Sequence, residues 1–173
     1  MEVYLIRHTT PLLTPRLIYG RSEVLLTETF DQEWGVLKRL LPEDFDVVYS
    51  SPALRCTELA KRITPDFQTD NRLTELNFGE WEGKTWDTVD QVQLQLWMDD
   101  FVNVTVPGGE SMVEMFERVK HFWQELSSNP CQKTAVVTHA GVIRLILSLV
   151  RQIPLALVFE IKVGYGEVIL IEI

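Results

Sequence analysis

Two of the three histidines in this chain directly follow short apolar runs that are typical of buried strands. His8 follows residues 3–6 and Arg7, and His139 follows residues 135–138. A residue that follows a parallel strand lies at the carboxyl edge of the sheet, where open α/β folds bind their ligands. An imidazole at that edge can act as a nucleophile or as an acid–base group. The adjacent arginine indicates that the ligand is an anion.

Two further charged side chains are expected at the same edge. Arg55 lies in the first turn of a helix that follows the second predicted strand, and Glu75 follows the third. Because neighbouring parallel strands end on one rim, these two should lie near Arg7, His8 and His139. Arginine binds phosphate oxygens with two donors, imidazole can form a covalent bond to phosphorus, and a carboxylic acid can protonate a leaving oxygen. The five side chains together favour phosphoryl transfer.

The segments that must position these groups alternate between strand and helix patterns. Strands are expected at residues 2–6, 45–49, 69–73, 133–138, 155–162 and 166–172. Helices are expected at residues 29–41, from Ser51 as N-cap with Pro52 at the first position, from the capping box at residues 111–114, and at residues 141–150. This alternation predicts a three-layer α/β/α fold, with a mostly parallel sheet and an antiparallel C-terminal edge strand.

The length predicts one domain that spans residues 1–173. Within it, residues 76–110 have an irregular pattern rich in aromatic side chains and glycines, and we expect them to form an insert that borders the active site. Aromatic side chains of this kind are more often core than substrate platform.

Composition and charge exclude several classes of function. A hydrophobic content of 46%, a charged content of 24% and a net charge of −9 are typical of a globular protein without a basic face, so neither nucleic acid nor a membrane is an expected partner. Cys56 and Cys131 have no metal-ligand spacing and favour a reducing, cytoplasmic environment. We expect neither a signal peptide nor a membrane-spanning segment.

Four segments of the chain carry a more specific pattern. They are Leu5-Ile6-Arg7-His8, Ser51-Pro52-Ala53-Leu54-Arg55-Cys56-Thr57, Arg72-Leu73-Thr74-Glu75-Leu76-Asn77-Phe78-Gly79-Glu80-Trp81-Glu82-Gly83 and Val137-Thr138-His139-Ala140-Gly141. Their order resembles that of the histidine phosphatase superfamily, which has the phosphoglycerate mutase-like fold. The resemblance implies that His8 accepts the phosphate and that Arg7, Arg55 and His139 bind it. It also implies that Glu75 protonates the leaving alcohol and then activates water.

One departure from that family points to a particular branch. Thr9 stands where the family usually has glycine, and its hydroxyl or amide can still donate to phosphate. The segment Ile18-Tyr19-Gly20-Arg21-Ser22-Glu23-Val24 is similar to α-ribazole-5'-phosphate phosphatases of cobalamin assembly. Tyr19 and Arg21 are therefore candidate substrate-binding residues, together with Ser111, whose helix cap borders the expected pocket. For Arg21, exposure to solvent is an equal alternative.

Each assignment has a structural alternative. Arg55 could pair with Glu58 on its own helix, and Glu75 competes with Glu80 and Glu82 for the acid role; the resemblance selects Glu75. The third histidine, His121, is expected on the solvent side of its helix.

The leading hypothesis is a metal-independent phosphomonoesterase without a cofactor, which acts on a small phosphorylated metabolite. The alternatives are a broad-specificity phosphatase of sugar phosphates or phosphoglycerate, a mutase, and an inactive binding or scaffold protein on the same fold. We expect no tail beyond the last strand to close the site, which favours hydrolysis over the mutase reaction. Two converging histidines without an aspartate cluster disfavour a metallohydrolase. An exposed edge strand would permit a homodimer.

Overall fold

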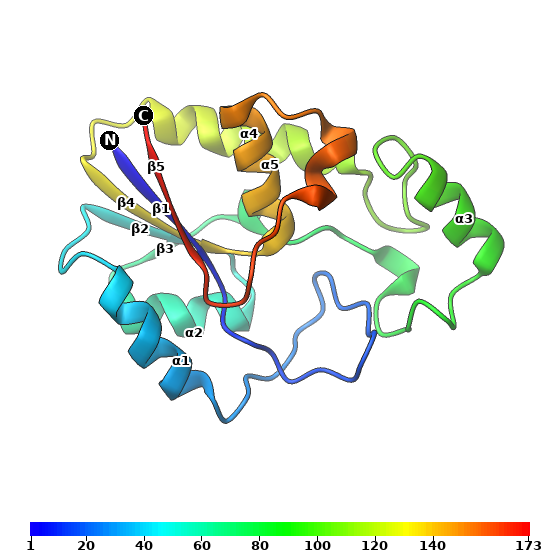
Figure 1. The fold of residues 1–173 in the computed structure, drawn as a ribbon, viewed down its shortest axis with the longest axis horizontal. Helices are drawn as coiled ribbons and strands as arrows, with labels where there is room; N and C mark the ends of the chain where they lie inside the picture. Colours follow the sequence, from blue (N-terminus) through cyan, green and yellow to red (C-terminus); the bar gives the residue numbers. More distant parts are fainter.

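A computed structural model describes all 173 residues and has three layers, with helices on both faces of one sheet (Figure 1). The five strands lie in the order β3-β2-β4-β1-β5. All neighbours are parallel except β1 and β5, which are antiparallel. The predicted fold class is therefore confirmed. The strands are β1 (Glu2–Arg7), β2 (Val47–Ser50), β3 (Gln68–Thr69), β4 (Lys133–Thr138) and β5 (Val168–Glu172).

The helices divide between the two faces of the sheet. Helices α4 and α5 cover one face, and α1 and α2 cover the other (Figure 1). The α-helices are α1 (Phe30–Leu37), α2 (Leu54–Ile63), α3 (Gln91–Asp99), α4 (Met112–Ser127) and α5 (Ala140–Arg151). Short 3-10 helices are η1 (Lys38–Leu40), η2 (Asn71–Leu73), η3 (Gly79–Trp81) and η4 (Leu155–Glu160).

The alternation of side chains along the central strands produces two hydrophobic clusters. Leu5 and Val136 point to the side of α4 and α5, whereas Ile6, Ala135 and Val137 point to the side of α1 and α2. Both clusters are sealed from solvent, because each of these five residues is completely buried. The central strands are thus held on both faces, and their carboxyl ends are fixed in relation to one another.

Two predicted strands are wrong in part or in full. Residues 155–162 form no strand, and Leu155–Glu160 is η4 instead, because a short apolar run does not distinguish helical from extended backbone. Of residues 69–73, only Thr69 belongs to β3, and η2 then begins after Asp70, whose side chain accepts from the amide of Arg72. The turn leads directly to the loop that carries Glu75.

The predicted N-cap of α2 is also wrong. Ala53 occupies that position, and Pro52 precedes the helix instead of starting it. The hydroxyl of Ser51 lies 2.8 Å from Nε2 of His139 and accepts a hydrogen bond of 3.4 Å from the Ala53 amide, ahead of the first helical residue. A carboxylate from a distant loop replaces it, since Glu23 accepts a hydrogen bond of 3.0 Å from the Leu54 amide.

Residues 76–110 contain η3 and α3, and they extend away from the sheet (Figure 1). Trp81 and Trp97 from this segment are buried, and Trp86 stacks on Trp97 with ring centroids 5.9 Å apart. These aromatic side chains therefore pack against one another and extend the hydrophobic cluster that lies on the side of α4 and α5.

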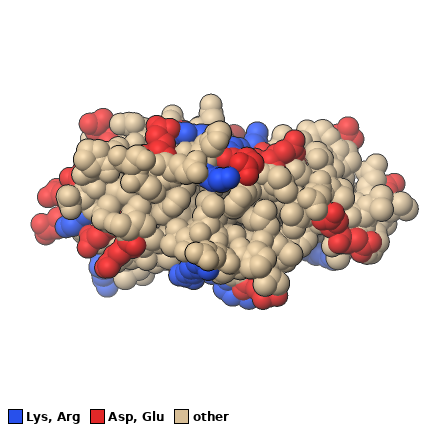
Figure 2. Space-filling view, turned by 90° about the horizontal axis from the view of Figure 1, so that it is seen from above, with Lys and Arg blue, Asp and Glu red and all other residues tan.

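Charged side chains are interspersed on the surface. Figure 2 shows one face of the molecule, on which acidic and basic residues alternate without a continuous basic patch. None of the helices combines the length and apolar character needed to cross a bilayer.

Candidate active site

The imidazole of His8 lies directly after β1 and is almost completely buried. Its Nδ1 is 2.7 Å from the carbonyl oxygen of Thr9, so Nδ1 carries the proton and donates it. In the neutral ring, Nε2 is then left with its lone pair. Burial, together with the charge of Arg55, lowers the pKa of His8 to about 3. The ring is therefore neutral at pH 7.

Two arginines flank this histidine and are held by backbone carbonyls. Arg7 donates to the Val163 carbonyl at 2.6 Å. Arg55 is completely buried and donates to the carbonyls of Gly20 and Ser22 at 2.7 and 3.0 Å. The Nε atom of each arginine is buried without a hydrogen-bond partner. Such donors are costly to leave unpaired, so the site is built to receive an acceptor.

The second histidine lies close to the first. The ring centroids of His8 and His139 are 5.3 Å apart, and His139 is held by the hydroxyl of Ser51. Burial and the nearby Arg55 lower the pKa of His139 well below its ordinary value. Cys56, which is fully buried in the helix α2, contacts the same ring, with its Sγ 3.6 Å from Nε2.

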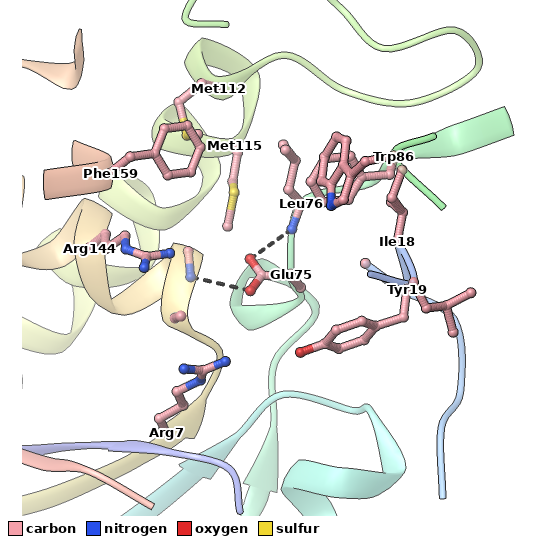
Figure 3. Close-up of a pocket in the computed structure, with 15 residues that line it drawn as sticks. Arg7, Ile18, Tyr19, Glu75, Leu76, Trp86, Met112, Met115, Arg144 and Phe159 are labelled. Atoms are coloured by element: carbon pink, nitrogen blue, oxygen red, sulfur yellow. Dashed lines mark hydrogen bonds between the residues drawn. The ribbon is translucent and has the colours of Figure 1, made fainter. Parts of the chain in front are cut away.

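The carboxylate of Glu75 faces the start of α5. It accepts hydrogen bonds from the amides of Gly141 at 3.2 Å and Leu76 at 3.0 Å (Figure 3). It lines two cavities, one of about 240 Å³ that also contains Arg7 and one of about 110 Å³ that also contains Arg55. Glu75 thus lies where a group bound between the two arginines would meet its leaving alcohol.

The remaining predicted site residues have different positions. The hydroxyl of Thr9 is buried without a partner, close to His8. Tyr19 lines the larger cavity, and its hydroxyl lies 3.2 Å from that of Tyr165. Arg21 lines the smaller cavity but also pairs with Glu110 at 2.9 Å, so it is neither free nor purely solvent-exposed.

Ser111 is not brought to the site. It lines neither cavity, and its hydroxyl and amide form the capping box of α4 with Glu114. Both of its polar groups are thereby occupied. The structure supports the helix-cap alternative for this residue. His121 is exposed, as predicted.

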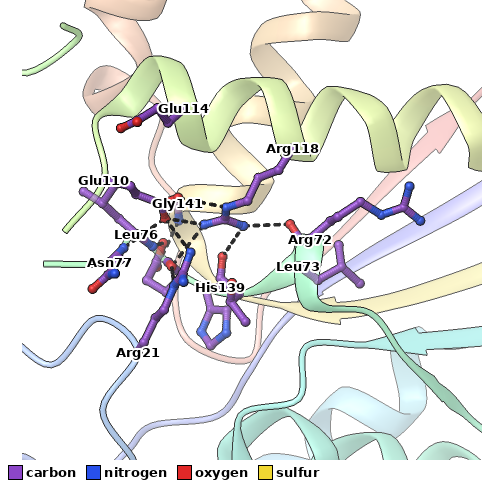
Figure 4. A network of polar contacts seen from close by, with 12 residues as sticks. Arg21, Arg72, Leu73, Leu76, Asn77, Glu110, Glu114, Arg118, His139 and Gly141 are labelled. Carbon is purple, nitrogen blue, oxygen red and sulfur yellow. Dashed lines mark hydrogen bonds and ion pairs between the residues drawn. The ribbon is translucent and has the colours of Figure 1, made fainter. Parts of the chain in front are cut away.

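Sequence reasoning missed the residues that hold the Glu75 loop. Arg118 of α4 donates to the carbonyls of Arg72, Thr74 and Glu75 and pairs with Glu110 at 2.6 Å (Figure 4). Both partners of this ion pair are mostly buried. An arginine on an amphipathic helix ordinarily faces solvent, so no local signal in the sequence distinguishes Arg118.

Tyr165 was likewise missed as a site residue. Its ring lies 3.7 Å from the guanidinium carbon of Arg7, and its centroid lies 5.6 Å from that of His8. Tyr165 falls in the short segment between the strands predicted at residues 155–162 and 166–172, so no pattern marked it as a site residue. The tertiary structure places it over the site, because β5 runs antiparallel to β1.

The arrangement provides a neutral imidazole, two cationic groups with unpaired donors and a carboxylate, all at one edge of the sheet. These groups can bind a phosphate, attack it and protonate a leaving oxygen. The geometry brings together all five residues that the sequence selected for phosphoryl transfer: Arg7, His8, Arg55, Glu75 and His139.

Comparison with characterised proteins agrees with this chemistry. Residues 3–173 match the model of the histidine phosphatase superfamily, branch 1. A putative phosphoserine phosphatase 2 of Hydrogenobacter thermophilus is 31% identical, over 89% of this chain and 80% of that protein. An adenosylcobalamin/alpha-ribazole phosphatase of Salmonella typhimurium is 26% identical, over 96% and 87%.

A solved structure extends the similarity to the fold. The alpha-ribazole phosphatase from Shigella flexneri superposes with a TM-score of 0.90 at 25% identity, and covers 100% of this chain and 91% of that one. The match to the family model extends over nearly the whole chain, and the sheet order and the site occupy that same region. The chain therefore belongs to the histidine phosphatase superfamily and is a phosphoric monoester hydrolase.

Proposed function

We propose that this enzyme hydrolyses α-ribazole 5'-phosphate through a phosphohistidine at Nε2 of His8, without a metal ion. The observation that carries the mechanism is the 2.7 Å hydrogen bond from Nδ1 to the Thr9 carbonyl, which leaves the Nε2 lone pair free. The lowered pKa of His8, about 3, keeps that lone pair available at neutral pH. No three His, Cys, Asp or Glu side chains lie together as metal ligands would, which supports metal-independent chemistry.

In the first step, Nε2 attacks phosphorus opposite the ester oxygen. The nitrogen–phosphorus bond forms as the bond to the alcohol oxygen breaks. Glu75, in its protonated form, gives its proton to that oxygen. The unpaired Nε donors of Arg7 and Arg55 are suited to the charge on the phosphoryl oxygens.

In the second step, water attacks the phosphohistidine. Glu75, now ionised, takes a proton from the water, and the nitrogen–phosphorus bond breaks to release phosphate. His8 returns to its neutral state and Glu75 to its protonated state. His139 is buried, and its ring centroid lies 5.3 Å from that of His8. It contributes to phosphate binding in both steps.

Two findings support the proposed substrate. The larger cavity is lined by Glu75 and is the space in which the leaving alcohol would bind. Of its 15 lining residues, 10 are hydrophobic. A flat, weakly polar alcohol such as a benzimidazole nucleoside fits such walls better than a small charged one. Proteins named alpha-ribazole phosphatases occur among both the sequence relatives and the solved structures.

The nucleophile is tested by comparing wild type with His8→Ala in the presence of a chelator. Wild type is expected to release phosphate from an aryl phosphate, and His8→Ala to be slower by about 10³-fold or more. His121→Ala, an exposed histidine, is the matched control and should behave as wild type. The trapped phosphoenzyme should be labile in acid and stable in base. Full activity of His8→Ala, or a base-labile phosphoenzyme, would refute the nucleophile assignment.

The substrate is tested separately by measuring kcat/KM for α-ribazole 5'-phosphate, phosphoserine, 3-phosphoglycerate and a sugar phosphate. The proposal predicts a clear maximum for α-ribazole 5'-phosphate. A flat profile would indicate a broad-specificity phosphatase, and phosphate return to a second position of phosphoglycerate would indicate a mutase.

A further inference from the structure

Arg144 carries a charge in the larger cavity that the phosphate chemistry does not use. It lies on α5, and only its Nε is engaged, in a hydrogen bond of 2.9 Å to the Ile161 carbonyl. Its two Nη atoms form neither a hydrogen bond nor an ion pair. Figure 3 shows the guanidinium pointing into the cavity beneath the ring of Phe159. The side chain is thus fixed at Nε, with its outer donors turned toward the space for the alcohol.

The surroundings of this guanidinium shield it in part from solvent. Arg144 is only partly exposed, and burial lowers its pKa. The ring of Phe159, 5.8 Å from its guanidinium carbon, covers one side. A partly desolvated cation with free donors gains most from an acceptor that is delivered into the cavity.

We propose that Arg144 selects the leaving alcohol by donating from its Nη atoms to a neutral ring nitrogen or hydroxyl of a flat, nucleoside-like group. This role rests on the hydrolytic function proposed above, and the feature that Arg144 recognises is the hydrogen-bond acceptor of the alcohol. The same group packs between the apolar walls formed by Trp86, Phe159 and Met115. Arg144 is therefore a specificity-determining residue rather than part of the phosphate cradle.

The lining of the cavity argues against a small hydroxy acid as the leaving alcohol. The charged residues that line it are Arg7, Arg144 and Glu75. A small hydroxy acid could pair its carboxylate with Arg144, but it would leave the apolar walls of a cavity of about 240 Å³ in contact with water.

The test compares Arg144→Met with wild type on two substrates. Methionine keeps an apolar stem but removes the donors. We expect kcat/KM for α-ribazole 5'-phosphate to fall about 10- to 100-fold, the cost of a hydrogen bond from a charged donor. Phenyl phosphate, which is flat but offers no such acceptor, should change less than about threefold. Arg144→Lys should recover part of the loss, because it restores a charged donor.

Arg151→Met is the matched control, since Arg151 is an exposed arginine of the same helix. It should leave both kcat/KM values unchanged. Thermal unfolding of Arg144→Met checks that the fold is intact. An equal loss on both substrates would overturn the inference. So would a selective loss on 3-phosphoglycerate, assayed as a third substrate, because it would mean that Arg144 binds a carboxylate.

Equilibrium binding separates failure of this inference from failure of the proposed function. In the His8→Ala background, Arg144→Met should weaken binding of α-ribazole 5'-phosphate about 10-fold or more. This measurement needs no turnover. If wild type proves inactive on every phosphomonoester while this loss is observed, the proposed function fails and the role of Arg144 stands. Unchanged binding refutes the role of Arg144 alone.

Discussion

A histidine that attacks phosphorus must be neutral, and the surroundings of His8 ensure this in two ways. Burial between the helix layers penalises the imidazolium, and Arg55 adds repulsion, which together lower the pKa to about 3. The Thr9 carbonyl then fixes which nitrogen holds the proton. The same arginine that would bind phosphate therefore also keeps the nucleophile in its reactive form.

Glycine at position 141 leaves room for the carboxyl group of Glu75. A Cβ added there would overlap Oε1 of Glu75 and approach Cε of Met115 to 3.2 Å. Gly141→Ala should therefore displace the carboxyl group and lower kcat by about 100-fold, the effect of a small misplacement of a catalytic group. Steady-state kinetics on an aryl phosphate measures this.

Gly35→Ala is the control for this substitution. Gly35 lies within α1, and an added Cβ meets no atom within 4 Å. It should keep wild-type kcat and raise the free energy of unfolding by about 0.5–1 kcal/mol, since alanine is the better helix former. A wild-type kcat for Gly141→Ala would mean that Glu75 is not the acid or is not held by this contact.

At the scale of elements, α4 serves the site through its first two turns. Its capping box fixes where the helix begins, and Arg118, about two turns later, binds three carbonyls of the segment that carries Glu75. Glu110 connects α4 to the segment that follows Glu75, because it pairs with Arg118 and accepts a hydrogen bond from the Asn77 amide. Thus the helix is a support for the acid, not a source of catalytic groups.

Ser111→Ala separates the role of the cap from a role in substrate binding. Loss of the cap should lower the free energy of unfolding by about 1 kcal/mol, as measured by denaturant titration. The kcat/KM for α-ribazole 5'-phosphate should stay within about twofold of wild type, because Ser111 lines neither cavity. Ser111→Thr keeps the hydroxyl that both accepts from the Glu114 amide and donates to the Glu114 carboxylate, and it should restore stability. If kcat/KM falls while stability is retained, Ser111 contacts substrate after all.

The whole molecule encloses His8 and His139 between its layers, and this makes its stability depend on pH. Both folded-state pKa values lie below 6.5, the ordinary value that applies in the unfolded chain. Below pH 6.5 the unfolded chain therefore binds more protons than the folded one, so stability falls as the pH decreases toward 3. Above pH 6.5 neither histidine contributes to the pH dependence.

Denaturant unfolding at pH 7 and pH 5 tests this expectation. Each buried histidine should lower the free energy of unfolding by up to about 1.4 kcal/mol for each pH unit below 6.5, in addition to any effect of carboxylates. The difference between the two pH values should shrink in the double variant His8→Asn/His139→Gln and remain in His121→Asn, whose histidine is exposed. An undiminished difference in the double variant would contradict the assignment to the buried pair.

Much of the fold could be read from local patterns. The apolar runs at β1, β2 and β4 pack against hydrophobic clusters on both faces of the sheet, which gives them a clear signal, and the capping box of α4 is a short-range feature. The apolar run of residues 155–162 lacks a distinguishing period, and it was mistaken for a strand although it forms η4. The cap of α2 could not be predicted either, because Glu23 reaches it from a separate loop.

The alternating patterns of the sequence were sufficient to predict the fold class, and the resemblance of four segments was sufficient to predict the family. The five candidate phosphoryl-transfer residues could be expected at one edge, because they follow strands whose ends share that edge. The groups that hold and surround these five residues became apparent only from the folded structure. Arg118, Tyr165 and Arg144 act across distances in sequence that no local pattern records, through carbonyls and rings of other elements. The structure also engages Ser51 with His139 and occupies Ser111 in its helix cap. Hydrogen bonding of a polar side chain depends on which partners the folded chain brings within about 3 Å, and this is a property of packing rather than of spacing in the sequence.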